Sequence, residues 1–143
     1  MRTISPTDLA ARLRLGITRT ARRLRQEAGG SLSPSQIAAL ATIERHGPLT
    51  PSELAQRERV QRPTVTRVLA RLEEAGLAQR TGDPADRRSS LVTITAAGRA
   101  LLAAQRTRKD AYLARRLDKL DAADRATLER AAELLERLLE DPE

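Results

Sequence analysis

The 143-residue sequence contains no cysteine, tryptophan or phenylalanine, and Tyr112 is its only aromatic side chain. Without cysteine the chain can form neither a disulfide nor a thiolate metal site. Without aromatic platforms it lacks the usual means of stacking the bases of single-stranded nucleic acids. No run approaches the roughly 18 apolar residues that a membrane-spanning helix needs. We therefore expect a cytoplasmic protein that binds no membrane and requires no metal or cofactor.

Positive charge is in excess, with 26 lysines and arginines against 19 acidic residues and a net charge of +7. Cationic side chains that neutralise phosphates release counterions, so this balance favours a polyanionic partner such as double-stranded DNA. Most of the charge is arginine, which suits contacts with phosphate and guanine. A GC-rich genome would also enrich arginine, so composition alone leaves both explanations open.

Capping motifs and apolar spacing predict the helices of the first third of the chain. Ser5-Pro6 opens a helix expected to run to the glycines at 29–30, and Ser33-Pro34 opens a second that ends near Gly47. The arginines of the first helix are interpreted as a solvated surface, with a position beside DNA as the alternative. His46 lies in the last turn of the second helix and has no partner for catalysis.

The middle of the chain has the pattern of a helix-turn-helix. Thr50-Pro51-Ser52-Glu53 begins a short helix, and a tight turn at 58–61 leads into a helix from about Arg62 to Ala75. Two short helices joined by a turn, the second with a polar and basic exposed face, are typical of this DNA-binding motif.

Beyond Leu77 the apolar spacing changes from helical to alternating. We expect strands at 78–80 and 91–94, joined by a charged loop at 81–89 that contains turn-forming residues. A long helix then begins at Thr95 and reaches about Leu117, and Asp121 opens a final helix with an apolar stripe.

Two stretches together resemble the MarR family of bacterial transcription regulators. The first combines residues 49–55, 62–69 and 72–77, and the second joins Asp83-Pro84-Ala85-Asp86-Arg87-Arg88 to residues 91–98. The resemblance covers nearly the whole chain. It implies a mainly α fold with a small β-hairpin wing (α+β), as one domain over 1–143. It also implies a winged helix-turn-helix at 33–95 and dimerisation helices at 5–29 and 96–140.

The helix that begins near residue 61 is the expected recognition helix, because its exposed start can enter the major groove. Arginine can bind guanine, glutamine can bind adenine, and the methyl group of threonine can contact thymine. For Arg62 and Arg67 the alternative is a phosphate contact. The sequence departs from the family at Gln61, a weaker capping residue than the serine often found there. The candidates are Gln61, Arg62, Thr64, Thr66 and Arg67, followed for backbone contacts by Thr50, Ser52 and Arg57.

In the wing, Arg88 is expected to enter the minor groove, where a narrow A·T-rich segment concentrates negative potential. Asp86 would orient Arg88, and Arg87 would meet a phosphate. For Asp83 we favour an ordinary turn-forming role. The carboxylates lack an accompanying nucleophile, metal-ligand cluster or glycine-rich phosphate loop, so we expect no enzymatic activity.

The resemblance implies a sequence-specific regulator, a repressor by analogy, that binds a palindromic operator as a homodimer. A small-molecule effector between the winged lobe and the dimerisation helices would release it. Tyr112 and nearby arginines could line the effector site, although a core position for Tyr112 is the simpler interpretation. The alternatives are a non-specific, nucleoid-associated DNA-binding protein and a winged helix that binds only another protein.

Overall fold

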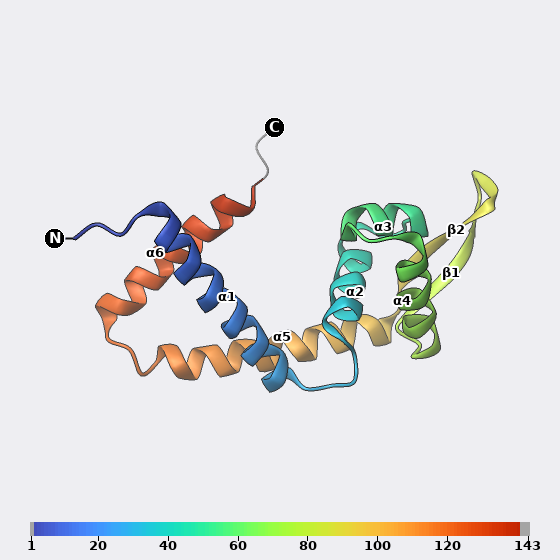
Figure 1. Cartoon of the computed structure of the whole chain (residues 1–143). Coiled ribbons are helices and arrows are strands. Elements are labelled where there is room, and N and C mark those ends of the chain that lie inside the picture. The colour runs from blue at the N-terminus through green and yellow to red at the C-terminus, as the bar shows by residue number, and fades with distance from the viewer. Residues whose placement is uncertain (1, 141–143) are drawn as a thin grey trace.

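The computed structural model describes residues 2–140, which form six helices and one two-stranded antiparallel sheet. Figure 1 shows a winged lobe at one end and the terminal helices at the other, with one long helix running between them. In chain order the elements are α1 (Pro6–Ala28), α2 (Pro34–His46), α3 (Pro51–Glu58), α4 (Arg62–Glu74), β1 (Ala78–Asp83), β2 (Asp86–Ile94), α5 (Ala96–Leu117) and α6 (Ala122–Leu139).

Five of the six helices begin at a capped residue, as their sequence motifs predict. In each case a side-chain oxygen accepts a hydrogen bond from the backbone N–H three residues ahead, which satisfies a donor that the helix cannot pair internally. The capping residues are Ser5, Ser33, Thr50, Thr95 and Asp121. The exception is α4, where Gln61 makes no side-chain capping bond. The weak cap expected at Gln61 is therefore confirmed.

The predicted loop at 81–89 is wrong, because the two strands continue through most of it. β1 pairs with β2 in antiparallel register from Ala78 opposite Ile94 to Gly82 opposite Ser90. The register then shifts so that Asp83 pairs with Asp86, and only Pro84 and Ala85 lie between the strands. The side chain of Asp83 accepts a bond of 2.9 Å from the backbone N–H of Ala85, which confirms its turn-forming role. The outer part of this ribbon extends into solvent and has no buried face. Its sequence therefore lacks the alternation of apolar and polar residues by which a strand is predicted.

The hydrophobic core lies inside the winged lobe. Leu49 and Val92 exchange backbone bonds of 3.2 and 2.8 Å, so the segment before α3 is tied to the base of the wing. Leu102 of α5 is also buried, which anchors this long helix to the lobe. The largest fully buried side chains are Leu40, Ile43, Leu49, Leu54, Leu69, Leu72 and Val92. Truncating such a buried side chain to alanine typically lowers the free energy of unfolding by about 2–5 kcal/mol, so these residues are important for the stability of the lobe.

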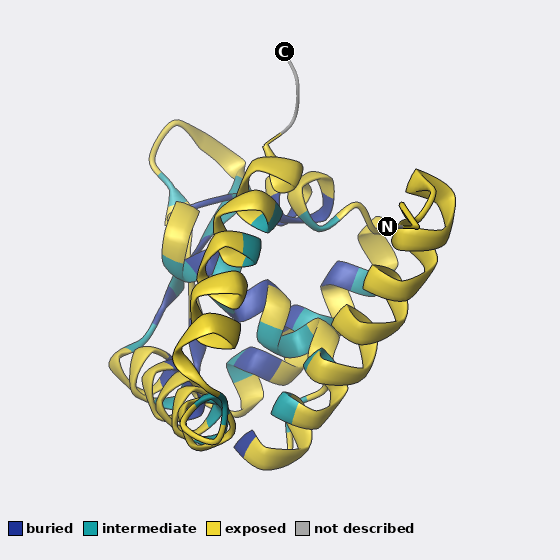
Figure 2. Cartoon of the chain, turned by 90° about the vertical axis from the view of Figure 1, so that its left-hand side faces the viewer, coloured by how far each residue is buried: buried dark blue, intermediate teal, exposed yellow. Residues whose placement is uncertain are grey.

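The terminal helices bury little in a single chain, as Figure 2 shows by their predominantly exposed colouring. Ile17 of α1 is 49% exposed and Leu138 of α6 is 73% exposed, although both belong to predicted apolar stripes. None of the described residues of α6 is buried. The predicted apolar stripes of these helices are therefore left largely uncovered in the single chain. Within residues 2–140, no helix combines the length and apolarity needed to cross a membrane.

Candidate nucleic-acid interface

The exposed start of α4 forms the centre of the candidate interface. Val65, Leu69 and Leu72 turn one face of the helix into the core. The other face is thereby directed to solvent, and Gln61, Arg62, Thr66 and Arg67 are exposed there. Thr64 is half-buried, so it offers less surface than its neighbours. The structure therefore brings four of the five recognition-helix candidates to the surface.

Contacts between α3 and α4 join two residues that the sequence suggested separately. The Nη1 of Arg62 donates to the Oγ of Ser52, which places this guanidinium against the first turn of α3. The hydroxyl of Thr66 donates to the backbone oxygen of Arg62 at 3.0 Å. Its methyl group is left for an apolar contact. Thr50 uses its hydroxyl to cap α3, and Arg57 is exposed on that helix.

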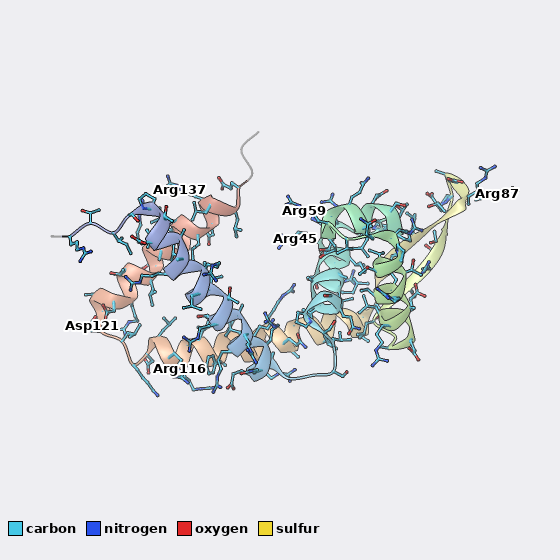
Figure 3. All side chains as sticks on the ribbon, in the orientation of Figure 1. Arg45, Arg59, Arg87, Arg116, Asp121 and Arg137 are labelled. Atoms are coloured by element: carbon cyan, nitrogen blue, oxygen red, sulfur yellow. The ribbon has the colours of Figure 1, made fainter. Side chains whose placement is uncertain are left out.

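The wing carries its charged residues at the far end of the ribbon. Arg87 projects from the tip, well away from the helices, in Figure 3. Asp86 accepts a bond of 2.9 Å from the backbone N–H of Arg88. Asp86 thus organises the backbone at the start of β2, while its expected action on the guanidinium of Arg88 stays a prediction. Asp86, Arg87 and Arg88 are all exposed.

An ion pair that the sequence did not reveal connects the wing to the recognition helix. Arg80 of β1 donates through Nε to Oε1 of Glu73 near the end of α4. Because these side chains are about one-third exposed, the pair contributes modestly to stability. Its geometric effect is to link the strand that carries the wing to the helix that would enter the groove.

A cavity of about 720 Å³ lies where the end of α1, the start of α2 and the middle of α5 meet. Its apolar lining includes Leu24, Leu32 and Ile37. Its cationic lining residues are Arg22, Arg25 and Lys109. Gln105, a polar residue only 5% exposed, also lines it and donates to the backbone oxygen of Gly29 at 3.4 Å. This volume and mixed lining are typical of sites for small amphipathic molecules.

Tyr112 lines a different cavity, of about 540 Å³, between α1 and α5. It is half-buried, so the interpretation of Tyr112 as a core residue is wrong. The guanidinium carbons of Arg23 and Arg116 lie 5.7 and 5.0 Å from the ring centroid, a cation–π arrangement. The Nε of Arg23 also donates to the tyrosine hydroxyl at 3.2 Å. Tyr112 therefore joins α1 to α5 and does not line the cavity beside the winged lobe.

Comparison with known proteins agrees with this geometry. Residues 32–90, which include the helix-turn-helix and most of the wing, match the family described as the MarR family. An HTH-type transcriptional regulator of Mycobacterium bovis is 38% identical over 138 residues, which cover 96% of each chain. The HTH-type transcriptional repressor NicR of Pseudomonas putida is 35% identical over 71 residues, covering 50% of this chain and 45% of its own.

A crystal structure of a transcriptional regulator from Pseudomonas aeruginosa has the same fold. It superimposes with a TM-score of 0.87 at 37% sequence identity, and the match covers 99% of this chain and 100% of the other. The similarity therefore includes the terminal helices as well as the winged lobe.

Proposed function

The chain belongs to the MarR family of DNA-binding transcriptional regulators, and we propose that it is a cytoplasmic repressor that binds a palindromic operator as a homodimer. The observation that carries this proposal is the exposed, cationic start of α4, flanked by a wing with two arginines at its tip. Such a pairing can place one element in the major groove and the other in the adjacent minor groove.

The proposed homodimer rests on the terminal helices. Leu9, Leu13 and Ile17 of α1 and Leu134 and Leu138 of α6 are each more than one-third exposed in the single chain. A soluble monomer seldom leaves such stripes open to water, because covering them is favourable by about 25 cal/mol per Å² of apolar surface. A second copy related by a two-fold axis covers equivalent stripes on both chains.

We expect the protein to be a dimer at low micromolar concentration and to protect an inverted repeat with half-site centres about 10 base pairs apart. This spacing follows because two symmetry-related α4 helices must enter successive major grooves on one side of the duplex. Light scattering measures the mass of the free protein and of the complex, and hydroxyl-radical footprinting of genomic fragments locates the site. A stable monomer, or uniform protection without symmetry, would favour the non-specific alternative.

Repression and its relief are proposed from two further observations. The relative from Pseudomonas putida, which matches half of this chain, is named a repressor. The 720 Å³ cavity lies between the winged lobe and the terminal helices, so its occupant would touch both parts. We propose that a small aromatic acid or similar amphipathic anion binds there and shifts the population of lobe orientations away from the DNA-binding form.

A panel of aromatic carboxylates, with benzoate as the simplest member, tests this effector site. At millimolar concentration we expect at least one to raise the thermal midpoint and weaken operator binding, because it binds the two states unequally. Lys109→Ala should reduce both effects, whereas the matched Lys119→Ala, at a lysine outside the cavity lining, should leave them unchanged. Equal responses in both variants would show that Lys109 does not contact the bound carboxylate.

A further inference from the structure

The edge of the winged lobe away from the wing carries two arginines that the candidate interface does not include. Figure 3 shows Arg45 and Arg59 projecting on this side, which in that view faces the terminal helices. Arg45 lies in the last turn of α2, and Arg59 follows the end of α3. Both are exposed. We call these two residues the inner-edge arginines.

The acidic neighbour of each inner-edge arginine is engaged with another element. Glu44, which precedes Arg45, accepts a bond of 2.9 Å from Arg106 of α5. Glu58, which precedes Arg59, accepts a bond from the hydroxyl of Thr42 on α2. Among residues 2–140, neither Arg45 nor Arg59 forms a salt bridge. The edge thus presents two exposed guanidinium groups that are not held in an ion pair within the described chain.

The backbone at Arg59 determines how α3 ends. Arg59 has φ 55° and ψ 44°. Among residues 2–140 it is the only residue other than glycine with a positive φ. This left-handed conformation is disfavoured for an L-residue, because its Cβ approaches the following carbonyl oxygen. Glycine would adopt it without that penalty. A left-handed residue is a common way to end a helix, and here it ends α3 and holds Arg59 at the turn before α4.

We propose that the inner-edge arginines bind DNA phosphates near the centre of the operator, between the two half-sites. This inference rests on the proposed two-fold dimer, in which the edges opposite the wings face each other across the symmetry axis. The recognition helix and the wing would then contact each half-site and its outer flank. Arg45 and Arg59 would extend the contacts inward, as positioning contacts that carry no base specificity.

Operator binding of single variants tests the proposal, with the duplex fragment that the wild-type protein protects in footprinting as the probe. Arg45→Ala and Arg59→Ala should each weaken binding roughly five- to tenfold, whatever the central base sequence. Each should also lower the slope of log affinity against log salt by about 2, because each phosphate contact contributes about 0.9 and the dimer contains two copies. Arg59→Lys should retain most of the affinity.

Two further variants distinguish the loss of the Arg59 side chain from the effect of its backbone conformation and from a general decrease in the positive charge of the protein. Arg59→Gly should weaken binding like Arg59→Ala but raise the thermal midpoint by about 2–4 °C, since it relieves the left-handed conformation. Arg99→Ala removes an exposed charge from the first turn of α5, which passes below the lobe on the side away from α3 in Figure 1. It should leave the affinity and the salt slope unchanged.

Four outcomes distinguish the phosphate contacts from the alternatives. The losses described above, with intact dimers, support the phosphate contacts. Wild-type affinity and salt slope in both alanine variants would overturn them while leaving the proposed operator binding intact. Dissociation of the free variants into monomers would also overturn them, because it would assign the arginines to contacts between the two copies. Absence of any footprint with the wild-type protein would instead contradict the proposed function itself.

Discussion

Gly98→Ala should lower the free energy of unfolding by about 3 kcal/mol, although it adds only one methyl group. A Cβ at this position would lie 2.3 Å from the backbone oxygen of Leu77 and 2.7 Å from Cγ1 of Ile94. These atoms belong to the junction where β2 enters α5 beside the end of α4. The backbone oxygen cannot rotate away as a flexible side chain could, so the junction itself must open.

Urea unfolding at a fixed protein concentration measures this loss, because the stability of a dimer depends on concentration. Gly82→Ala provides the matched control, since a Cβ at Gly82 would meet no atom within 4 Å. We expect its stability to stay within about 0.5 kcal/mol of the wild type. A Gly98→Ala protein as stable as this control would contradict the close packing of the β2–α5 junction.

The Gly98 junction also illustrates what the sequence predicts well. Thr95 begins α5 by accepting from the N–H of Gly98 at 3.1 Å, and its hydroxyl donates to the backbone oxygen of Gly76 at 2.7 Å. The cap was predictable because it depends on residues three apart in sequence. The second bond was not, because it joins residues 19 apart that meet only after α4, the wing and α5 have packed.

The same distinction separates the predicted and unpredicted parts of the candidate site. The start of α4 was predicted from its proline, its apolar stripe and its basic exposed face. The contacts of Arg62 with Ser52 and of Arg80 with Glu73 depend on how α3, α4 and β1 are oriented in space. The left-handed turn at Arg59 carries no sequence indication, since glycine and asparagine, not arginine, normally mark it.

The wing shows a different limit. Its strands were predicted only at 78–80 and 91–94, close to the core, because alternating burial marks a strand in sequence and the outer ribbon has no buried face. The structure extends pairing to Asp83 opposite Asp86. As a result Arg88 lies within β2 and not in a loop, in the stretch 87–89 where the register shifts and the residues have no partner on β1.

This placement gives Arg88→Ala a specific expected result. Operator binding should weaken by roughly 1–3 kcal/mol, while the dimer and its thermal midpoint stay nearly unchanged, because Arg88 is exposed and supports no part of the core. Titrations of the wild type and the variant against the operator, together with light scattering and thermal unfolding of the free proteins, measure both effects. Unchanged affinity would remove Arg88 from the interface.

The sequence at the outer flanks of the operator distinguishes two roles for Arg88. If its guanidinium enters a narrow minor groove, the loss should be larger on A·T-rich flanks than on G·C-rich flanks, since narrowing strengthens the negative potential there. If Arg88 instead meets a phosphate, the loss should be similar on both flanks, and each contact removed should lower the salt slope by about 0.9. Arg87→Ala is the matched comparison on the neighbouring residue, and we expect it to follow the phosphate pattern. The two arginines have the same charge, are both exposed and both lie on β2, so we expect their variants to differ only in how the loss of affinity depends on the flanking sequence. The same dependence in both variants would show that the wing contributes charge without sensing groove width.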